Sequence, residues 1–270
     1  MKTLTELQTD HSTFSIGEAM SDGWKLVSKN LGYYILGGII AVAISAGVGI
    51  IPIVGGVANN LILSPCLMAG AIYVTWRISK GIAWTDFGEM FKGFNFLSPI
   101  MISSIIQFAA TFILGILFLL NYLDEMKEIF QLAQGADAFN NQEELKSLVL
   151  KLFTGEFVVL FLLLMLAILL ISVIWVFKIH FIVIYNMQAW PAMDMSRKLA
   201  SRNFLSLIAL FIVLGVLILI SAIPCGIGLL FSLPLSIGAV YSAFAQITHS
   251  DSDYEGDEKM FDFEENQNQA

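Results

Sequence analysis

The sequence predicts an all-α fold, a polytopic membrane protein with six transmembrane helices, amphipathic interface helices and a parallel internal repeat. Three observations lead to this fold class. Apolar residues make up 57% of the 270 residues and charged residues only 13%, whereas soluble domains carry about 25% charged residues. The apolar residues gather in six long runs, and a short basic phrase occurs twice, each time directly before such a run.

The six runs are the predicted membrane spans. A helix needs roughly 17 to 25 residues to cross a hydrocarbon core of about 30 Å. The runs that meet this length are Leu31–Ile53, Leu61–Ile78, Leu97–Asn121, Phe157–Phe177, Phe204–Ile223 and Cys225–Ile247. We expect residues 1–248 to form a single six-span transmembrane domain, with an outer loop at 122–156.

The acidity of the chain is concentrated at its C-terminal end. The net charge is −8, and residues 249–270 contain eight acids against one lysine, which accounts for −7 of it. This segment lacks the sustained apolar pattern of a packed element, so we predict a disordered acidic tail. Its acids alternate with aromatic residues, a pattern that also suits binding to a basic protein partner.

The positions of Lys and Arg predict the orientation in the membrane. Cytoplasmic connections are enriched in these residues. With the N-terminus inside, ten of those that precede the tail fall on the cytoplasmic side and only Lys127, Lys146 and Lys151 fall outside. We therefore expect both termini in the cytoplasm.

The short basic motif occurs twice, 173 residues apart. The copies are "SDGWKLVSKNLGYY" at 21–34 and "DMSRKLASRNFLSL" at 194–207. Each juxtamembrane Lys or Arg contributes about 1 kcal/mol of electrostatic attraction to an anionic leaflet. Asn tolerates the irregular backbone needed where a surface helix turns into the membrane. The predicted interface-anchor repeat consists of Trp24, Lys25, Lys29, Asn30, Arg197, Lys198, Arg202 and Asn203.

Helical spacing organises the segments before the first, third and fifth runs, which predicts amphipathic helices lying in the membrane interface. Before the third run, Phe87, Met90, Phe91 and Phe94 are expected on one face, with Lys92 on the other.

The return spans also resemble each other. "GAIY" at 70–73 matches "GAVY" at 238–241, and each follows a proline, Pro65 or Pro234. The unit is an interface helix, a span, a short outer hairpin and a return span, and both copies run in the same direction. We interpret the two prolines as span kinks whose lost hydrogen bonds are made good locally. The alternative is that they mark a substrate site of a carrier.

Small residues in the first span predict close helix packing. Gly37, Ala41, Ser45 and Gly49 recur every four residues, and such stripes let helices approach in lipid.

Catalytic, cofactor and metal sites are not predicted. The central part of each run contains no Asp, Glu, Lys, Arg or His, and ionisable groups there would indicate a functional site. Lys178 and His180, at the end of the fourth run, are interpreted as a snorkelling cation beside an interfacial histidine. The alternative is a pH-sensitive or headgroup-binding pair. The two cysteines lack zinc-ligand spacing.

Three longer stretches carry a family resemblance: "FSIGEAMSDGWKLVSKNLG", "LSPCLMAGAIYVTWRISKGIAWTDFGEMFKGF" and "MDMSRKLASRNFLSLI…PCGIGLLFSLPLSIGAVYSAF". They resemble the uncharacterised bacterial multi-pass membrane proteins related to the glycerophosphodiester phosphodiesterase membrane domain. The resemblance implies a helical protein of the bacterial cytoplasmic membrane. The phosphodiesterase chemistry of those relatives resides in a separate soluble domain, which we do not expect in this chain, so no catalytic residue is carried over.

These observations favour a non-enzymatic membrane protein that organises lipid or a protein partner in the cytoplasmic membrane. The alternative is a carrier for a lipid or other apolar small molecule, with a cavity lined by Pro65, Pro234 and their neighbours. An enzyme would need convergent polar residues at one membrane face, which the sequence does not present. The expected partners are the lipid bilayer and a protein bound through the acidic tail, and no nucleic acid is expected.

Overall fold

The computed structural model describes residues 12–52, 54–134, 146–147, 150, 155–223 and 226–249. Within these ranges every regular element is a helix, as the all-α prediction requires. Six helical stretches are long and apolar enough to cross a membrane, so the chain is a multi-pass membrane protein. They are Leu31–Gly49, Val54–Ser79, Phe87–Leu120, Gly155–Ile184, Phe204–Ala222 and Leu229–Thr248.

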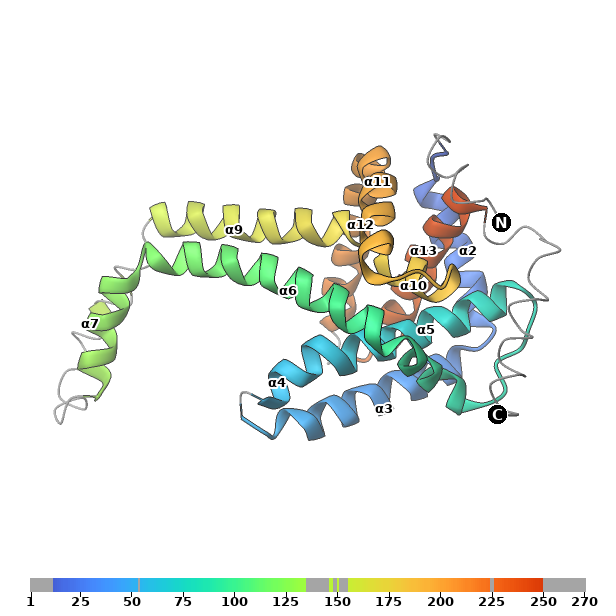
Figure 1. Ribbon diagram of the computed structural model, residues 1–270, viewed down its shortest axis with the longest axis horizontal. Coiled ribbons are helices and arrows are strands. Elements are labelled where there is room, and N and C mark those ends of the chain that lie inside the picture. Colours follow the sequence, from blue (N-terminus) through green and yellow to red (C-terminus); the bar gives the residue numbers. More distant parts are fainter. Residues whose placement is uncertain are drawn as a thin grey trace. The chain divides into compact units, whose positions relative to one another are not determined.

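The helices are labelled in Figure 1. In chain order they are α2 (Ile16–Ser28), α3 (Leu31–Gly49), α4 (Val54–Ala58), the π-helix η1 (Asn59–Leu63), α5 (Ser64–Ser79), the 3₁₀ helix η2 (Phe87–Phe96), α6 (Leu97–Leu120), α7 (Leu123–Gln134), α9 (Gly155–Ile174), α10 (Lys178–Ile184), α11 (Ala189–Arg202), α12 (Phe204–Ala222) and α13 (Leu229–Thr248).

The chain divides into two compact units. One contains the residues up to 103 and those from 175 onward, and the other contains residues 104–174. In the second unit, aromatic rings join α6 to α9, with 5.6 Å between the ring centroids of Phe118 and Phe157. Helix α7 lies within the predicted outer loop. The predicted acidic tail lies outside the described residues except for His249.

All six spans differ at one or both ends from their predicted boundaries, and the helix is also irregular in the second and the fourth. The second begins at Val54 rather than Leu61, and the turn before Ser64–Pro65 is π-helical. Proline has no N–H to donate to the carbonyl four residues earlier, and such ladder defects are accommodated by π turns. The fourth span was predicted at Phe157–Phe177, but its helix ends at Ile174 and a separate helix begins at Lys178. Here the Phe177 N–H donates to Ser196 Oγ at 3.1 Å instead of continuing the helical ladder.

The repeat unit occurs three times rather than twice. The order of interface helix, span and return span is α2, α3 and α4–α5; then η2, α6 and α9–α10; then α11, α12 and α13. The additional copy also has a motif where its interface helix turns into the span, because "NFLSPI" at 95–100 matches "NFLSLI" at 203–208. A left-handed residue follows each return helix, at Gly81 (φ 80°), Asn186 (φ 49°) and His249 (φ 51°). This common ending supports a threefold repeat of parallel units.

The three interface helices, α2, η2 and α11, each pack against the return helix of the preceding unit. The most extensive helix contacts are α13 with α2, α5 with η2, and α10 with α11; Figure 1 shows α2 beside α13. Because the third unit closes back on the first, the three junctions form a cycle. All three lie in the first compact unit.

The 3₁₀ geometry of η2 changes the face expected before the third span. With three residues per turn, positions i and i+3 eclipse. Met90 and Gly93 therefore share one buried edge, while Phe91 is 40% exposed and stacks on Phe94 along another. The prediction that Phe87, Met90, Phe91 and Phe94 form a single face was wrong, because it assumed α-helical spacing.

Candidate functional site

Two of the three junctions are made by glycines at which helix backbones touch. At the α2–α13 junction, a Cβ on Gly23 would lie 2.5 Å from Ala239 N, and a Cβ on Gly238 would lie 2.5 Å from Gly23 O. Val27 Cγ2 fills the same space, 2.7 Å from that second position. Small residues permit this approach where no hydrophobic effect drives helices together. Gly238 is the glycine of the "GAVY" motif.

The α5–η2 junction repeats this arrangement. A Cβ on Gly70, the glycine of "GAIY", would overlap the Met90 carbonyl, and a Cβ on Gly93 would overlap the Cys66 carbonyl. The two motifs therefore have the same role, which is to receive the backbone of an interface helix. At the α10–α11 junction the Phe177–Ser196 hydrogen bond takes the place of a glycine crossing.

The predicted anchor residues on α2 face outward. The Lys25 side chain is 68% exposed and binds Asp22 Oδ1 at 2.8 Å, one turn earlier. Trp24 is 40% exposed, and Lys29 is also exposed. Asn30 lies at the corner between α2 and α3, where its carbonyl accepts from the Tyr33 and Tyr34 amides.

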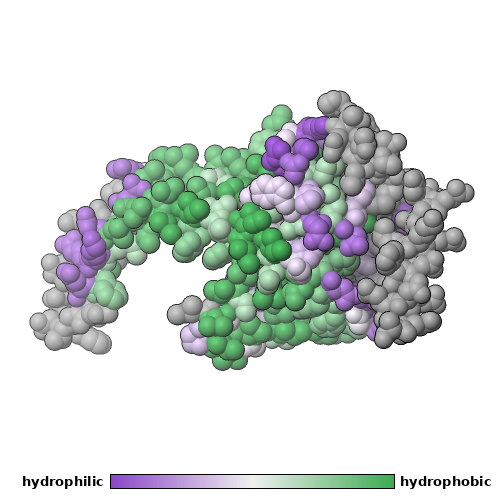
Figure 2. Space-filling view, viewed as in Figure 1, coloured by the Kyte–Doolittle hydropathy of each residue, from purple (hydrophilic) through white to green (hydrophobic). Residues whose placement is uncertain are grey.

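The anchor residues on α11 are held in the same way. Arg197 and Lys198 bind the two oxygens of Asp194, each at 2.7 Å. Arg202 is exposed, whereas Asn203, at the corner before α12, is buried and donates from Nδ2 to the carbonyls of Ser12 and Leu199. The structure therefore places both groups of anchor residues on interface helices, at different junctions. Figure 2 shows hydrophilic colour over α11 and hydrophobic colour over α3 and α4.

The Asp194 pairs make α11 sensitive to acid. Hydrogen bonds from Lys198 and Arg197 hold the pKa of the Asp194 carboxyl below its usual value. A carboxyl with a lowered folded-state pKa stabilises the fold above its unfolded pKa of about 4, and that contribution is lost as the pH falls through the folded pKa. We expect hydrogen-exchange protection of the α11 amides, corrected for intrinsic rates, to fall as the pH is lowered from about 5 to below 4. Asp194→Asn should lower protection at the higher pH and remove this difference; an unchanged difference would contradict the assignment.

Lys178 and His180 are buried, contrary to the interpretation as snorkelling and interfacial residues. Lys178 is 6% exposed and its Nζ donates to the Ser103 carbonyl at 3.2 Å. His180 is 3% exposed, with its ring centroid 5.0 Å from that of Phe244. Packing of α10 against α5 and α11, and of its rings against Phe244 of α13, encloses both side chains. The composition of the fourth span contains no signal for this packing.

A second buried charged group was also missed. Arg77 on α5 pairs with Glu89 on η2, and their side chains are only 17% and 12% exposed. The spacing of these residues in the sequence does not distinguish a buried pair from two interfacial charges. Among the described residues, no group of three or more His, Cys, Asp or Glu side chains could hold a metal ion.

The predicted kink and packing residues lie in different environments. Pro65 lies in the first turn of α5, and Pro234 lies inside α13. In the small-residue stripe, Gly37 is buried against Met90, whereas Gly49 is exposed. Ala41 and Ser45 are half-buried.

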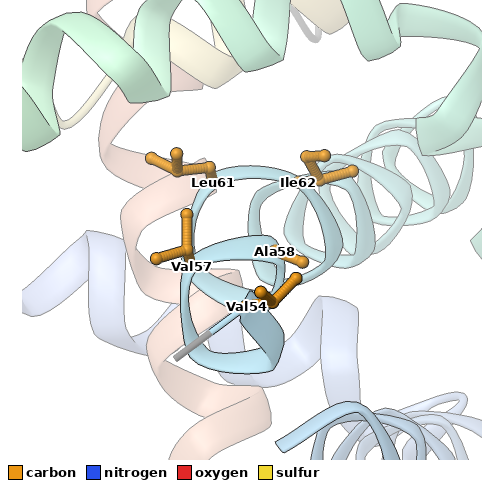
Figure 3. Close-up of a pocket in the computed structure, with 5 residues that line it drawn as sticks. All are labelled: Val54, Val57, Ala58, Leu61 and Ile62. Carbon is orange, nitrogen blue, oxygen red and sulfur yellow. The ribbon is translucent and has the colours of Figure 1, made fainter. Parts of the chain in front are cut away.

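A wholly apolar hollow of about 320 Å³ lies along α4 and η1 (Figure 3). Neither proline lines it. Its lining residues follow one face of the helix and are Val54, Val57, Ala58, Leu61 and Ile62.

Comparison with known proteins adds no relative. No protein-family model, curated protein or solved structure matches this chain. The resemblance to the membrane domain of glycerophosphodiester phosphodiesterases therefore stays a prediction from the quoted stretches, and the functional argument rests on the junctions and charges described above.

Proposed function

We propose that this chain is a non-enzymatic protein of the bacterial cytoplasmic membrane that organises lipid or a protein partner on its interface-helix side. The observation that carries the proposal is the cycle of junctions: α2, η2 and α11 are each fixed to a return helix, two of them through backbone contacts at glycine. Helices fixed in this way form a preorganised surface, and preorganisation lowers the entropic cost of binding.

Photo-crosslinking tests the surface directly. Trp190 on α11 and Leu219 on α12 are both 71% exposed, so a photoreactive amino acid at either position has equal access to its surroundings. We expect position 190 to give one reproducible adduct of defined mass, a lipid or a protein, and position 219 to give only bulk lipid adducts. The same adducts at both positions would refute the proposal.

The acidic tail is proposed as a second contact for a protein partner. Native mass spectrometry of the detergent-released protein, full-length and ending at Ser250, tests this contact. A partner lost on truncation supports it, and a partner retained by both forms assigns binding to the interface helices alone.

The orientation proposed here places the interface helices in the cytoplasm. Replacing Lys25, Lys29, Lys198 and Arg202 together with glutamate should impair insertion or invert the topology, because juxtamembrane cations set orientation. Cysteines introduced singly at Ser28 and Asn121, in a background without native cysteines, report the sidedness through membrane-impermeant labelling. Normal sidedness in the charge-reversed protein would contradict the role of these cations.

The apolar hollow on α4 and η1 favours a second candidate function, a carrier for a lipid or other apolar molecule. Its volume of about 320 Å³ is at the lower limit for small-molecule sites. Val57→Trp would fill it. If the chain is a carrier, this variant should slow exchange of a fluorescent lipid in proteoliposomes, whereas Val213→Trp, on the exposed surface of α12, should not.

A further inference from the structure

Helix α7 exposes an apolar face directly beyond the end of a membrane span. Leu123, Met126 and Phe130 recur at intervals of three and four residues, and all three are exposed, Phe130 by 62%. This spacing places them on one side of the helix. The other side carries Asp124 and Lys127, both exposed, which form an ion pair at 2.9 Å. Contact with an apolar surface would remove the first side from water and stabilise the helix there.

The turn between α6 and α7 is short and sets the direction of α7. The Asn121 amide donates to the Phe118 carbonyl at 3.2 Å, and Asn121 Nδ2 donates to the Leu117 carbonyl at 2.8 Å. These bonds satisfy carbonyls that the end of α6 leaves open. Figure 1 shows α7 running crosswise to α9 and to the adjoining part of α6. Because α6 and α9 are membrane spans, a helix crosswise to both lies parallel to the membrane surface.

The length of α6 and a group of aromatic rings place the start of α7 at the headgroup level. Helix α6 has 24 residues and is about 36 Å long, which exceeds a hydrocarbon core of about 30 Å. Its end at Leu120 therefore reaches the membrane surface opposite to η2. In the turn, the Tyr122 ring lies 5.3 Å from that of Phe118 and 5.1 Å from that of Phe157 on α9. Tyrosines gather at the interface between membrane and water.

The apolar surface of α6 continues into that of α7. Phe112, Ile116 and Leu120 are exposed on α6, and Leu123 and Met126 are the next exposed apolar residues along the chain. The surface that meets lipid on the span is thus continuous with the exposed face of α7. The apolar phase nearest to that face is the leaflet in which α6 ends.

The charge of α7 restricts which lipids can accept it. The helix contains three acids and one lysine, which gives a net charge of −2. Anionic headgroups attract basic segments near the membrane, and by the same physics they repel an acidic helix. Zwitterionic or uncharged headgroups impose no such repulsion.

We propose that α7 is an interfacial helix that docks on a lipid leaflet of low negative charge, at the membrane surface opposite to η2, with Leu123, Met126 and Phe130 inserted between the headgroups. This contact goes beyond the proposed function, which concerns the interface-helix side. It belongs to one repeat unit alone, because the corresponding connections of the other two units are the short segments 50–53 and 223–228.

Electron paramagnetic resonance of the full-length protein in phosphatidylcholine vesicles tests the docking. Nitroxide labels on Met126→Cys, Phe130→Cys and Asp124→Cys, each in a background without native cysteines, are compared for access to oxygen and to a water-soluble nickel chelate. Labels at 126 and 130 should prefer oxygen and lie about 5 to 10 Å below the headgroup level. The label at 124, on the polar side, should prefer the nickel chelate.

Two neighbouring substitutions that add the same charge provide the matched control. Phe130→Asp should move the label at 126 out of the apolar layer, whereas Gln131→Asp, on the exposed polar side, should leave its depth unchanged. A label on Ile116→Cys, within the span, should keep its oxygen access in both variants and so exclude unfolding. Replacing part of the phosphatidylcholine with phosphatidylglycerol should reduce the depth at 126 at low salt, and high salt should restore it.

Four results would overturn the proposal. Equal nickel access at 124 and 126 would place the whole of α7 in water. Access of neither reagent to 126 would mean that protein covers the apolar face, as a second copy or another partner. Equal shifts in Phe130→Asp and Gln131→Asp would assign the effect to charge rather than to the apolar face. An unchanged depth in phosphatidylglycerol would refute the lipid preference. The proposed function on the interface-helix side would stand after any of these results.

Discussion

Gly70→Ala is expected to lower the stability of the fold by about 3 kcal/mol or more, at the upper end of the range for overpacked cores. The added Cβ would overlap the Met90 carbonyl, which is backbone and cannot rotate away as a side chain would. Relief requires η2 to move off α5. Because this junction also buries Gly93, Cys66 and the Arg77–Glu89 pair, the movement disrupts more than one contact.

The thiol of Cys66 can be used to measure the stability of Gly70→Ala. Cys66 is fully buried at this junction, so in a Cys225→Ser background its reaction with a thiol-reactive dye during heating reports the opening of α5 from η2. Gly38→Ala is the matched control in α3, where a Cβ would meet nothing within 4 Å. That control should leave the midpoint unchanged or raise it, since Ala is favoured over Gly in a helix by about 1 kcal/mol. A Gly70→Ala protein as stable as the control would show that α5 and η2 do not touch here.

Glu89→Gln is expected to destabilise the protein by about 3 to 5 kcal/mol, the usual cost of leaving a buried charge without its partner. Arg77 and Glu89 belong to different helices, and both side chains are mostly removed from solvent. The amide keeps the volume of the carboxylate, so packing is little changed and the loss reports the charge. Thermal unfolding followed by circular dichroism measures the effect.

An exposed ion pair in the same chain is the control for that prediction. Asp22 and Lys25 also form an ion pair, but their side chains are 48% and 68% exposed. Exposed pairs contribute between zero and about 1 kcal/mol, so Asp22→Asn should leave the midpoint almost unchanged. Equal losses in both variants would mean that Glu89 is solvated rather than buried. Restoration of stability by Arg77→Met in the Glu89→Gln background would confirm that the unpaired guanidinium was the cause.

The amino-acid sequence by itself determined the helical class and the membrane spans. An apolar run of sufficient length has few alternatives in lipid, because its backbone polar groups must be satisfied within the segment. The corners could also be predicted: Asn30 and Asn203 lie where an interface helix meets a span. Both signals are local, since composition and spacing act within one segment. The sequence predicted only two of the three repeat units. The unit that begins with η2 was missed, because η2 is a 3₁₀ helix and its motif lacks the paired cations of the other two copies.

Only the tertiary structure decided which helices meet and which polar groups they enclose. "GAIY" and "GAVY" looked alike in the sequence, yet nothing in either motif indicated that Gly70 receives η2 or that Gly238 receives α2. Lys178 is buried rather than snorkelling, because α10 packs among α5, α11 and α13. Burial and pairing depend on contacts between residues far apart in the chain, so the periodicity of a single segment does not contain them. For the same physical reason, the buried Arg77–Glu89 pair became apparent only in the contact between α5 and η2.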